Sequence, residues 1–309
     1  MQPLRNDEIF GTWCTLLLPV NPDNSINFLK LESEIDILIS SKVNGIYSNG
    51  TAGEFDSQTE KEFDQINFLL AERCNKASIP FQIGCSHTSP VISLERVKRA
   101  VKLNPGAIQV ILPDWYPPNM NEIVHYLQKI AQAAHPVGLV LYNPPHAKRI
   151  LQPEDYRHIA QESIPLLGCK VGSREAPWYA EMKNLVPELS LFVPGHALAT
   201  GVQSGANGSY SNVACLSPKM AQQWYEMMNS DIEKALELEK RIQLFINNNI
   251  IPYITEKNFS SQAIDKFLAA IGGWADIGTR LRWPYEGLDE NEVMPVREKC
   301  KLTLPESFL

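Results

Sequence analysis

Short runs of consecutive apolar residues alternate with longer stretches whose apolar residues recur every three to four positions. In the stretch 27–40, for example, Leu31 and Ile35 lie on one face, as in an amphipathic helix. Short apolar runs are typical of strands that are buried on both faces of a parallel sheet. We predict strands at residues 10–18, 43–48, 80–85, 107–112, 137–142, 166–170, 189–193 and 205–211.

The stretches between these strands have the helical period. They predict helices at residues 27–40, 59–74, 89–103, 121–134 and 176–184, and another that starts near 152–155. Eight strand–helix alternations in about 220 residues predict an α/β fold, a closed (β/α)8 TIM barrel. A doubly wound open sheet is the alternative, and it is disfavoured because no GxGxxG motif opens the first helix.

Beyond Pro218 the strand pattern stops. The remaining periodicity predicts only helices, at residues 220–247, 250–256, 261–270 and 290–300. We therefore expect a barrel over residues 1–219 that carries the active site, and a C-terminal helical extension over residues 220–309. No low-complexity linker separates the two parts, so we expect them to pack together.

Composition restricts the class of protein. The chain has 309 residues, of which 44% are hydrophobic and 20% charged, as in ordinary soluble proteins. Its formal net charge is -7 and it has no basic block, which argues against a nucleic-acid partner. No apolar run approaches a membrane span and residues 1–10 lack a signal-peptide core, so we expect no membrane association. Six cysteines without CxxC spacing predict free thiols in the cytoplasm and no metal site.

The strand at residues 166–170 ends in a lysine, Lys170, after an otherwise apolar run. Burial disfavours the charged form of an amine and lowers its pKa towards neutrality. A neutral amine on a rigid strand can form a Schiff base with a carbonyl substrate. The alternative is that the strand ends at the surface, with Lys170 in solvent.

The ends of other strands supply further candidates, because the active site of such a barrel lies at the carboxyl ends of its strands. In the turn Gly50-Thr51-Ala52-Gly53-Glu54, glycines flank two residues whose backbone N–H groups can turn towards a carboxylate. Tyr142 ends the strand next to that of Lys170, where its hydroxyl can transfer protons and Thr51 can bridge to it. If each motif is considered alone, the turn is explained as a tight strand-to-helix connection, and Tyr142 as a core residue whose hydroxyl is hydrogen-bonded. The combination with Lys170 favours a catalytic site.

These motifs, with Tyr142-Asn143-Pro144-Pro145, Gly168-Cys169-Lys170 and the glycine-rich segment 205–211, resemble the dihydrodipicolinate synthase/N-acetylneuraminate lyase superfamily over essentially the whole chain. The resemblance implies a (β/α)8 barrel, usually a homotetramer, and a Schiff base between a lysine and a 2-oxo acid such as pyruvate.

The resemblance also implies roles for individual residues. It makes Lys170 the Schiff-base lysine and Tyr142 the acid/base, assisted by Thr51. The turn that starts at Gly50 would bind the substrate carboxylate through the N–H groups of Thr51 and Ala52. Tyr210 would line the pyruvate end. We expect no cofactor and no metal, because the imine itself serves as the electron sink.

Three departures from the family pattern reduce the number of candidate activities. Ala52 replaces the second hydroxyl residue of the turn, and Trp115 lies near the position of the synthase's proton-relay tyrosine. Ala147 occupies the place of the arginine that holds the second substrate's carboxylate, with Lys148 and Arg149 beside it. We include Trp115 and Ala147 among the candidate substrate-binding residues. Loss of the bidentate arginine argues against a dicarboxylate-forming synthase.

The leading hypothesis is therefore a class I aldolase or lyase that acts on pyruvate and a 2-oxo acid, preferably a 2-oxo-3-deoxy sugar acid. The alternatives are a 2-oxo-3-deoxy acid dehydratase, dihydrodipicolinate synthase, and a non-catalytic relative that only binds a metabolite. We expect pyruvate as the small-molecule partner and a homo-oligomer, either a tetramer or a dimer.

Overall fold

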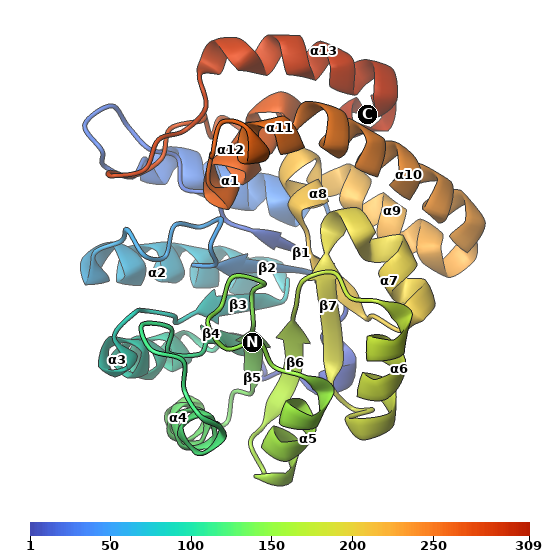
Figure 1. The fold of residues 1–309 in the computed structure, drawn as a ribbon. Coiled ribbons are helices and arrows are strands. Elements are labelled where there is room, and N and C mark those ends of the chain that lie inside the picture. The colour runs from blue at the N-terminus through green and yellow to red at the C-terminus, as the bar shows by residue number, and fades with distance from the viewer.

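Eight parallel strands close into a barrel in the computed structural model, which describes all of residues 1–309 (Figure 1). Each strand pairs with the next in the chain, and the last pairs with the first. The predicted fold class is confirmed. The strands are β1 (Gly11–Thr15), β2 (Gly45–Ser48), β3 (Phe81–Gly84), β4 (Ala107–Ile111), β5 (Leu139–Tyr142), β6 (Leu166–Lys170), β7 (Ser190–Pro194) and β8 (Gly208–Tyr210).

Helices follow the strands and surround them (Figure 1). The helices of the barrel are α1 (Phe28–Ser40), α2 (Glu60–Ala77), α3 (Pro90–Ala100), α4 (Met120–Ala134), α5 (Pro153–Gln161), α6 (Ala176–Leu185), α7 (Leu198–Ser204) and α8 (Asn212–Leu216). Reciprocal side-chain caps start α2 at Thr59 and α4 at Asn119. The short helices α7 and α8 were not predicted, because so few residues show no clear period.

The C-terminal part is helical, as predicted, and Figure 1 shows its helices gathered along one side of the barrel. The prediction of one helix over residues 220–247 was wrong, because Asp231 separates two helices and caps the second through the N–H of Lys234. The helices are α9 (Pro218–Ser230), α10 (Ile232–Asn249), α11 (Ile251–Thr255), α12 (Ser261–Gly272) and α13 (Val293–Thr303). The Thr12 hydroxyl in β1 donates to the carbonyl of Ala221 in α9 at 3.3 Å, so the extension packs on the barrel.

The interior of the barrel is filled by side chains rather than open. Trp13, Tyr47, Phe192 and Tyr210 belong to a buried cluster inside the strands. The Tyr210 hydroxyl donates to the Gln82 side-chain oxygen at 2.6 Å, below the carboxyl ends of the strands. This packing forms a rigid floor, on which the residues at the carboxyl ends are held.

A buried ion pair connects the turn after β2 to the C-terminal extension. The Lys266 ammonium in α12 lies 2.5 Å from a Glu54 carboxylate oxygen, and both side chains are almost completely buried. Lys266 also donates to the carbonyl of Arg280 at 2.6 Å, and the other Glu54 oxygen accepts the N–H of Arg282 at 2.7 Å. Because a buried charge requires its partners, this network holds α12 against the turn.

We predict that Lys266→Met lowers the free energy of unfolding by about 3–5 kcal/mol, because it leaves the Glu54 carboxylate buried without its cation. The measurement is urea denaturation. The matched control is Lys30→Met, which breaks the exposed Lys30–Asp276 pair and is expected to change stability by less than about 1 kcal/mol. Adding Glu54→Gln to Lys266→Met should restore part of the loss, and a strictly additive double variant would contradict the assignment.

Candidate active site

Lys170 ends β6 inside the barrel, where it pairs in register with Tyr142 of β5. Its ammonium nitrogen lies 4.2 Å from the centroid of the Tyr142 ring, 5.3 Å from that of Tyr210 and 5.5 Å from that of Tyr47. The alternative that Lys170 projects into solvent is therefore wrong. The three aromatic rings confine the amine at the carboxyl end of the strands.

Burial lowers the pKa of Lys170 to about 8, although Asp265 and Cys215 nearby raise it in opposition. Desolvation penalises the ammonium more than these groups stabilise it. With this pKa, about a tenth of the side chain is neutral at pH 7, compared with less than about a thousandth for an ordinary lysine. The amine can therefore act as a nucleophile near neutral pH.

A cavity of about 250 Å³ surrounds the Lys170 side chain. The structure brings five of the predicted site residues together in its lining: Thr51, Ala52, Tyr142, Lys170 and Tyr210. The Tyr210 hydroxyl, however, is already bonded to Gln82 below, so Tyr210 presents its ring to the cavity. Gly50 does not line the cavity. A side chain there would fall 2.7 Å from the Tyr47 ring, which accounts for the glycine.

The turn after β2 offers two free donors. Its later N–H groups are used internally, from Gly53 to the carbonyl of Gly50 and from Glu54 to that of Thr51, each at 3.0 Å. The N–H groups of Thr51 and Ala52 have no acceptor within the protein. Adjacent unpaired backbone donors at a cavity are suited to bind an anion such as a carboxylate.

Tyr142 is held in its neutral form. Burial raises the pKa of its hydroxyl to about 12, with the Thr51 side chain beside it acting in the opposite sense. A neutral phenol can donate a proton and take it back, and both residues share the cavity with Lys170.

Two predicted substrate-binding residues, Trp115 and Ala147, lie outside the cavity. Trp115 is on the loop between β4 and α4 with 85% of its surface exposed, and the N–H of Ala147 donates to the carbonyl of Pro144 in a tight turn. Neither residue lines the cavity of this chain, so their part in substrate binding stays a prediction. The Lys148 ammonium donates to the carbonyl of Trp115 at 2.7 Å, and Arg149 pairs with Asp155 at 3.0 Å. These contacts hold the neighbouring cations on the loops.

Sequence reasoning missed Asp265, which reaches the cavity from α12. Burial raises the pKa of its carboxyl to about 7, while Lys170 and the Cys215 thiol lower it in opposition. Ser261, Ile264 and, from α11, Ile254 line the same wall. The available signal was the charged pair Asp265-Lys266, which interrupts the apolar run of this helix after its polar first turn.

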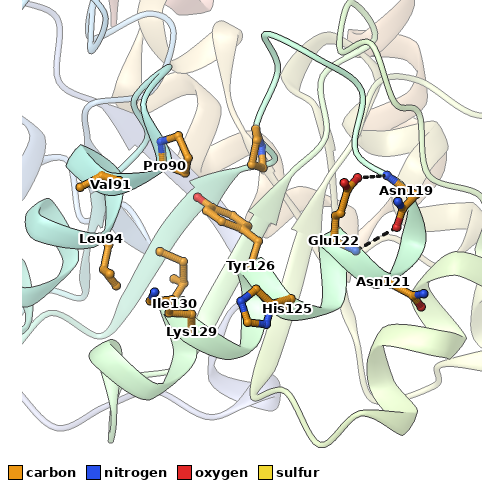
Figure 2. Close-up of a pocket in the computed structure, with 11 residues that line it drawn as sticks. Pro90, Val91, Leu94, Asn119, Asn121, Glu122, His125, Tyr126, Lys129 and Ile130 are labelled. Carbon is orange, nitrogen blue, oxygen red and sulfur yellow. Dashed lines mark hydrogen bonds between the residues drawn. The ribbon is translucent and has the colours of Figure 1, made fainter.

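A second, larger concavity of about 500 Å³ lies between α3 and α4 (Figure 2). The Glu122 and Asn119 side chains on its rim are bonded to each other's backbone at the start of α4. None of the predicted site residues lines this groove, so the chemistry is assigned to the cavity around Lys170.

No group of three His, Cys, Asp or Glu side chains is arranged to hold a metal ion. The six cysteines are all buried and unpaired. None of the helices combines the length and apolar character needed to cross a membrane.

Comparison with known proteins agrees with this geometry. The sequence model of the dihydrodipicolinate synthetase family matches residues 9–301. A 4-hydroxy-tetrahydrodipicolinate synthase from Brachyspira hyodysenteriae is 23% identical over 78% of this chain and 84% of that protein. Two solved structures are similar at 18–19% identity. The prophage protein YagE from E. coli K12, in complex with pyruvate, has a TM-score of 0.84 and covers 96% of this chain and 98% of its own. N-acetylneuraminate lyase from Fusobacterium nucleatum has a TM-score of 0.81, and the match covers 96% of this chain and 99% of that protein.

The low pKa of Lys170 can be measured directly. We predict that acetylation of Lys170 by acetic anhydride, followed by peptide mass spectrometry, is half-maximal near pH 8. In Asp265→Asn the midpoint should move to lower pH, because the carboxylate that raises this pKa is gone. A midpoint near the ordinary lysine value, or a shift to higher pH in the variant, would contradict the described electrostatics.

Proposed function

Because the chain belongs to the dihydrodipicolinate synthetase family, whose members are lyases, we propose that it is a Schiff-base lyase that acts on pyruvate and a longer 2-oxo acid. One observation carries the proposal. Lys170 is an amine with a lowered pKa, and it shares a confined cavity with a neutral tyrosine, Tyr142, and with two free backbone donors.

The proposed mechanism assigns a step to each of these groups. The neutral Lys170 amine attacks the carbonyl carbon of the 2-oxo acid, while the N–H groups of Thr51 and Ala52 hold its carboxylate. Tyr142 protonates the carbonyl oxygen, which leaves as water and completes the imine. In the cleavage direction, the imine accepts the electron pair of the bond between C3 and C4, and Tyr142 takes the proton from the C4 hydroxyl. The aldehyde leaves, Tyr142 returns the proton to C3 of the resulting enamine, and water then hydrolyses the imine to release pyruvate and regenerate the amine.

The relatives support pyruvate as a substrate, since the structure of YagE from E. coli K12 is a complex with pyruvate. We propose a 2-oxo-3-deoxy sugar acid as the longer substrate, because Lys170 is the only cation that lines the cavity. Once its amine is in the imine, no second cation remains for a distal carboxylate. Elimination of water from the same imine, as in a dehydratase, uses the same groups. A non-catalytic protein that only binds a metabolite does not require a lysine with a lowered pKa beside a neutral tyrosine, so the pairing of Lys170 with Tyr142 argues against that alternative.

The second candidate function is 4-hydroxy-tetrahydrodipicolinate synthesis, the activity named for the relative from Brachyspira hyodysenteriae. Against it, neither Ala147 nor the cations beside it line the cavity, and Lys148 and Arg149 are bonded elsewhere.

We also propose that the protein is a homo-oligomer in the cytoplasm. The adjacent side chains of Trp115 and Tyr116 are 85% and 81% exposed, which is typical of aromatic residues at a subunit contact. Six buried free thiols suit a reducing compartment.

Reductive trapping tests the lysine. With pyruvate and sodium borohydride, we predict a pyruvate-derived mass on the peptide that contains Lys170, because reduction fixes the imine as a stable amine. Lys266, which is equally confined but ion-paired, is the internal control and should stay unmodified. Lys170→Arg should abolish trapping, whereas Tyr142→Phe should slow turnover by about 100-fold or more. Catalysis by a protein whose Lys170 peptide is never labelled would refute the mechanism.

A coupled assay with pyruvate and aspartate semialdehyde separates the two candidates. We predict negligible synthase activity, since a missing charged contact to the second carboxylate costs on the order of 2–4 kcal/mol, or about 30- to 1000-fold in rate. A panel of 2-oxo-3-deoxy sugar acids runs alongside, and Ala147→Arg tests whether that position matters. Efficient turnover of the semialdehyde with no turnover of sugar acids would establish the synthase instead.

A further inference from the structure

The cavity has two charged side chains in its lining, and they come from different parts of the fold. Lys170 comes from β6 and Asp265 from α12 in the C-terminal extension. In the proposed function the lysine amine becomes part of the imine. Asp265 is then the charged protein side chain left to meet the remainder of the substrate.

The position of Asp265 is set by its helix. Ile264 and Asp265 come three and four positions after Ser261, so the three residues lie on one face of α12, and all three line the cavity. The next residue, Lys266, points away from it into the buried ion pair with Glu54. Glu54 ends the turn that contains Thr51 and Ala52, and Lys266 follows Asp265 directly. The Glu54–Lys266 ion pair therefore links the backbone donors of that turn to the helix segment that carries Asp265.

The groups around Asp265 provide no compensating second cation. The charge of Asp265 raises the pKa of four titratable side chains around it. They are Lys170 from β6, the Cys215 thiol from α8, and the hydroxyls of Tyr47 from β2 and Tyr142 from β5. Burial raises the pKa of the Asp265 carboxyl to about 7. It is therefore mainly ionised at pH 8 and mainly protonated at pH 6.

We propose that Asp265 is the specificity-determining residue of this site: its carboxylate accepts hydrogen bonds from hydroxyl groups on the distal part of the substrate and repels a second carboxylate there. The inference rests on the proposed function, because the substrate is first held as an imine on Lys170. Two carboxylate oxygens can accept several hydroxyl donors. Selectivity also requires a repulsive element against the competing ligand, and a like charge supplies it.

The test compares two ligands that differ only at C6. In 2-oxo-3-deoxygluconate this carbon is a hydroxymethyl group, and in 2-oxo-3-deoxyglucarate it is a carboxylate. The concentration that gives half-maximal trapping on Lys170 is measured for each by cyanoborohydride reduction and mass spectrometry. The ratio of the two concentrations cancels the titration of Lys170 itself, and no turnover is required.

For the wild type at pH 8, the diacid should need about tenfold more ligand than the neutral-ended acid, as expected for like charges across a partly screened cavity. The ratio should fall to within about threefold at pH 6, where Asp265 is protonated. In Asp265→Asn it should stay within about threefold at both pH values. The matched control Asp276→Asn, at an exposed site, should behave as the wild type does.

Each result supports or overturns the role of Asp265 in selecting between the two acids. Wild-type protein that traps both acids equally, or with a ratio that does not change between pH 6 and pH 8, overturns the role of Asp265 even if the variant does not fold. A ratio that persists in folded Asp265→Asn does the same. Absence of any pyruvate adduct on Lys170 overturns the proposed function and this inference with it, whereas a normal pyruvate adduct with an unselective ratio overturns the inference alone.

Discussion

The buried ion pair between Glu54 and Lys266 is the interaction on which the site depends. It joins a turn near the start of the barrel to a helix more than two hundred residues later, with both charges removed from solvent. Glu54 is the last residue of the turn that carries the free N–H groups of Thr51 and Ala52. Lys266 follows Asp265 directly. One electrostatic contact therefore fixes two walls of the cavity relative to each other, and a buried pair cannot slide without exposing an unpaired charge.

Lys170 shows how opposing effects set the reactivity of one amine. Three tyrosine rings lie within 5.5 Å of its nitrogen, and aromatic faces attract a cation. The carboxylate of Asp265 acts in the same direction. Desolvation outweighs them, and the fall of the pKa from 10.5 to about 8 corresponds to about 3 kcal/mol against the ammonium. The result is an amine that is partly neutral at physiological pH but still close to a carboxylate that stabilises an iminium cation.

Much of the architecture could be predicted from residue patterns. Buried parallel strands are continuous apolar runs and the helices around them are amphipathic, so both have local signals. The carboxyl ends of such strands meet at one end of the barrel. For that reason Thr51, Tyr142 and Lys170 could be placed together before any contact was known, and the cavity confirms that they share one lining.

By itself the sequence determined the closed barrel, the helical nature of the C-terminal part and the convergence of strand-end residues, because each depends on local period and on chain order. Only the tertiary structure decided that α12 brings Asp265 into the cavity, and that Ala147, Lys148 and Arg149 do not line it although Pro145 of the same loop does. These outcomes depend on contacts between residues far apart in the chain. No local pattern specifies which face of a late helix covers the end of a barrel, since that choice is made by the buried partners it finds there.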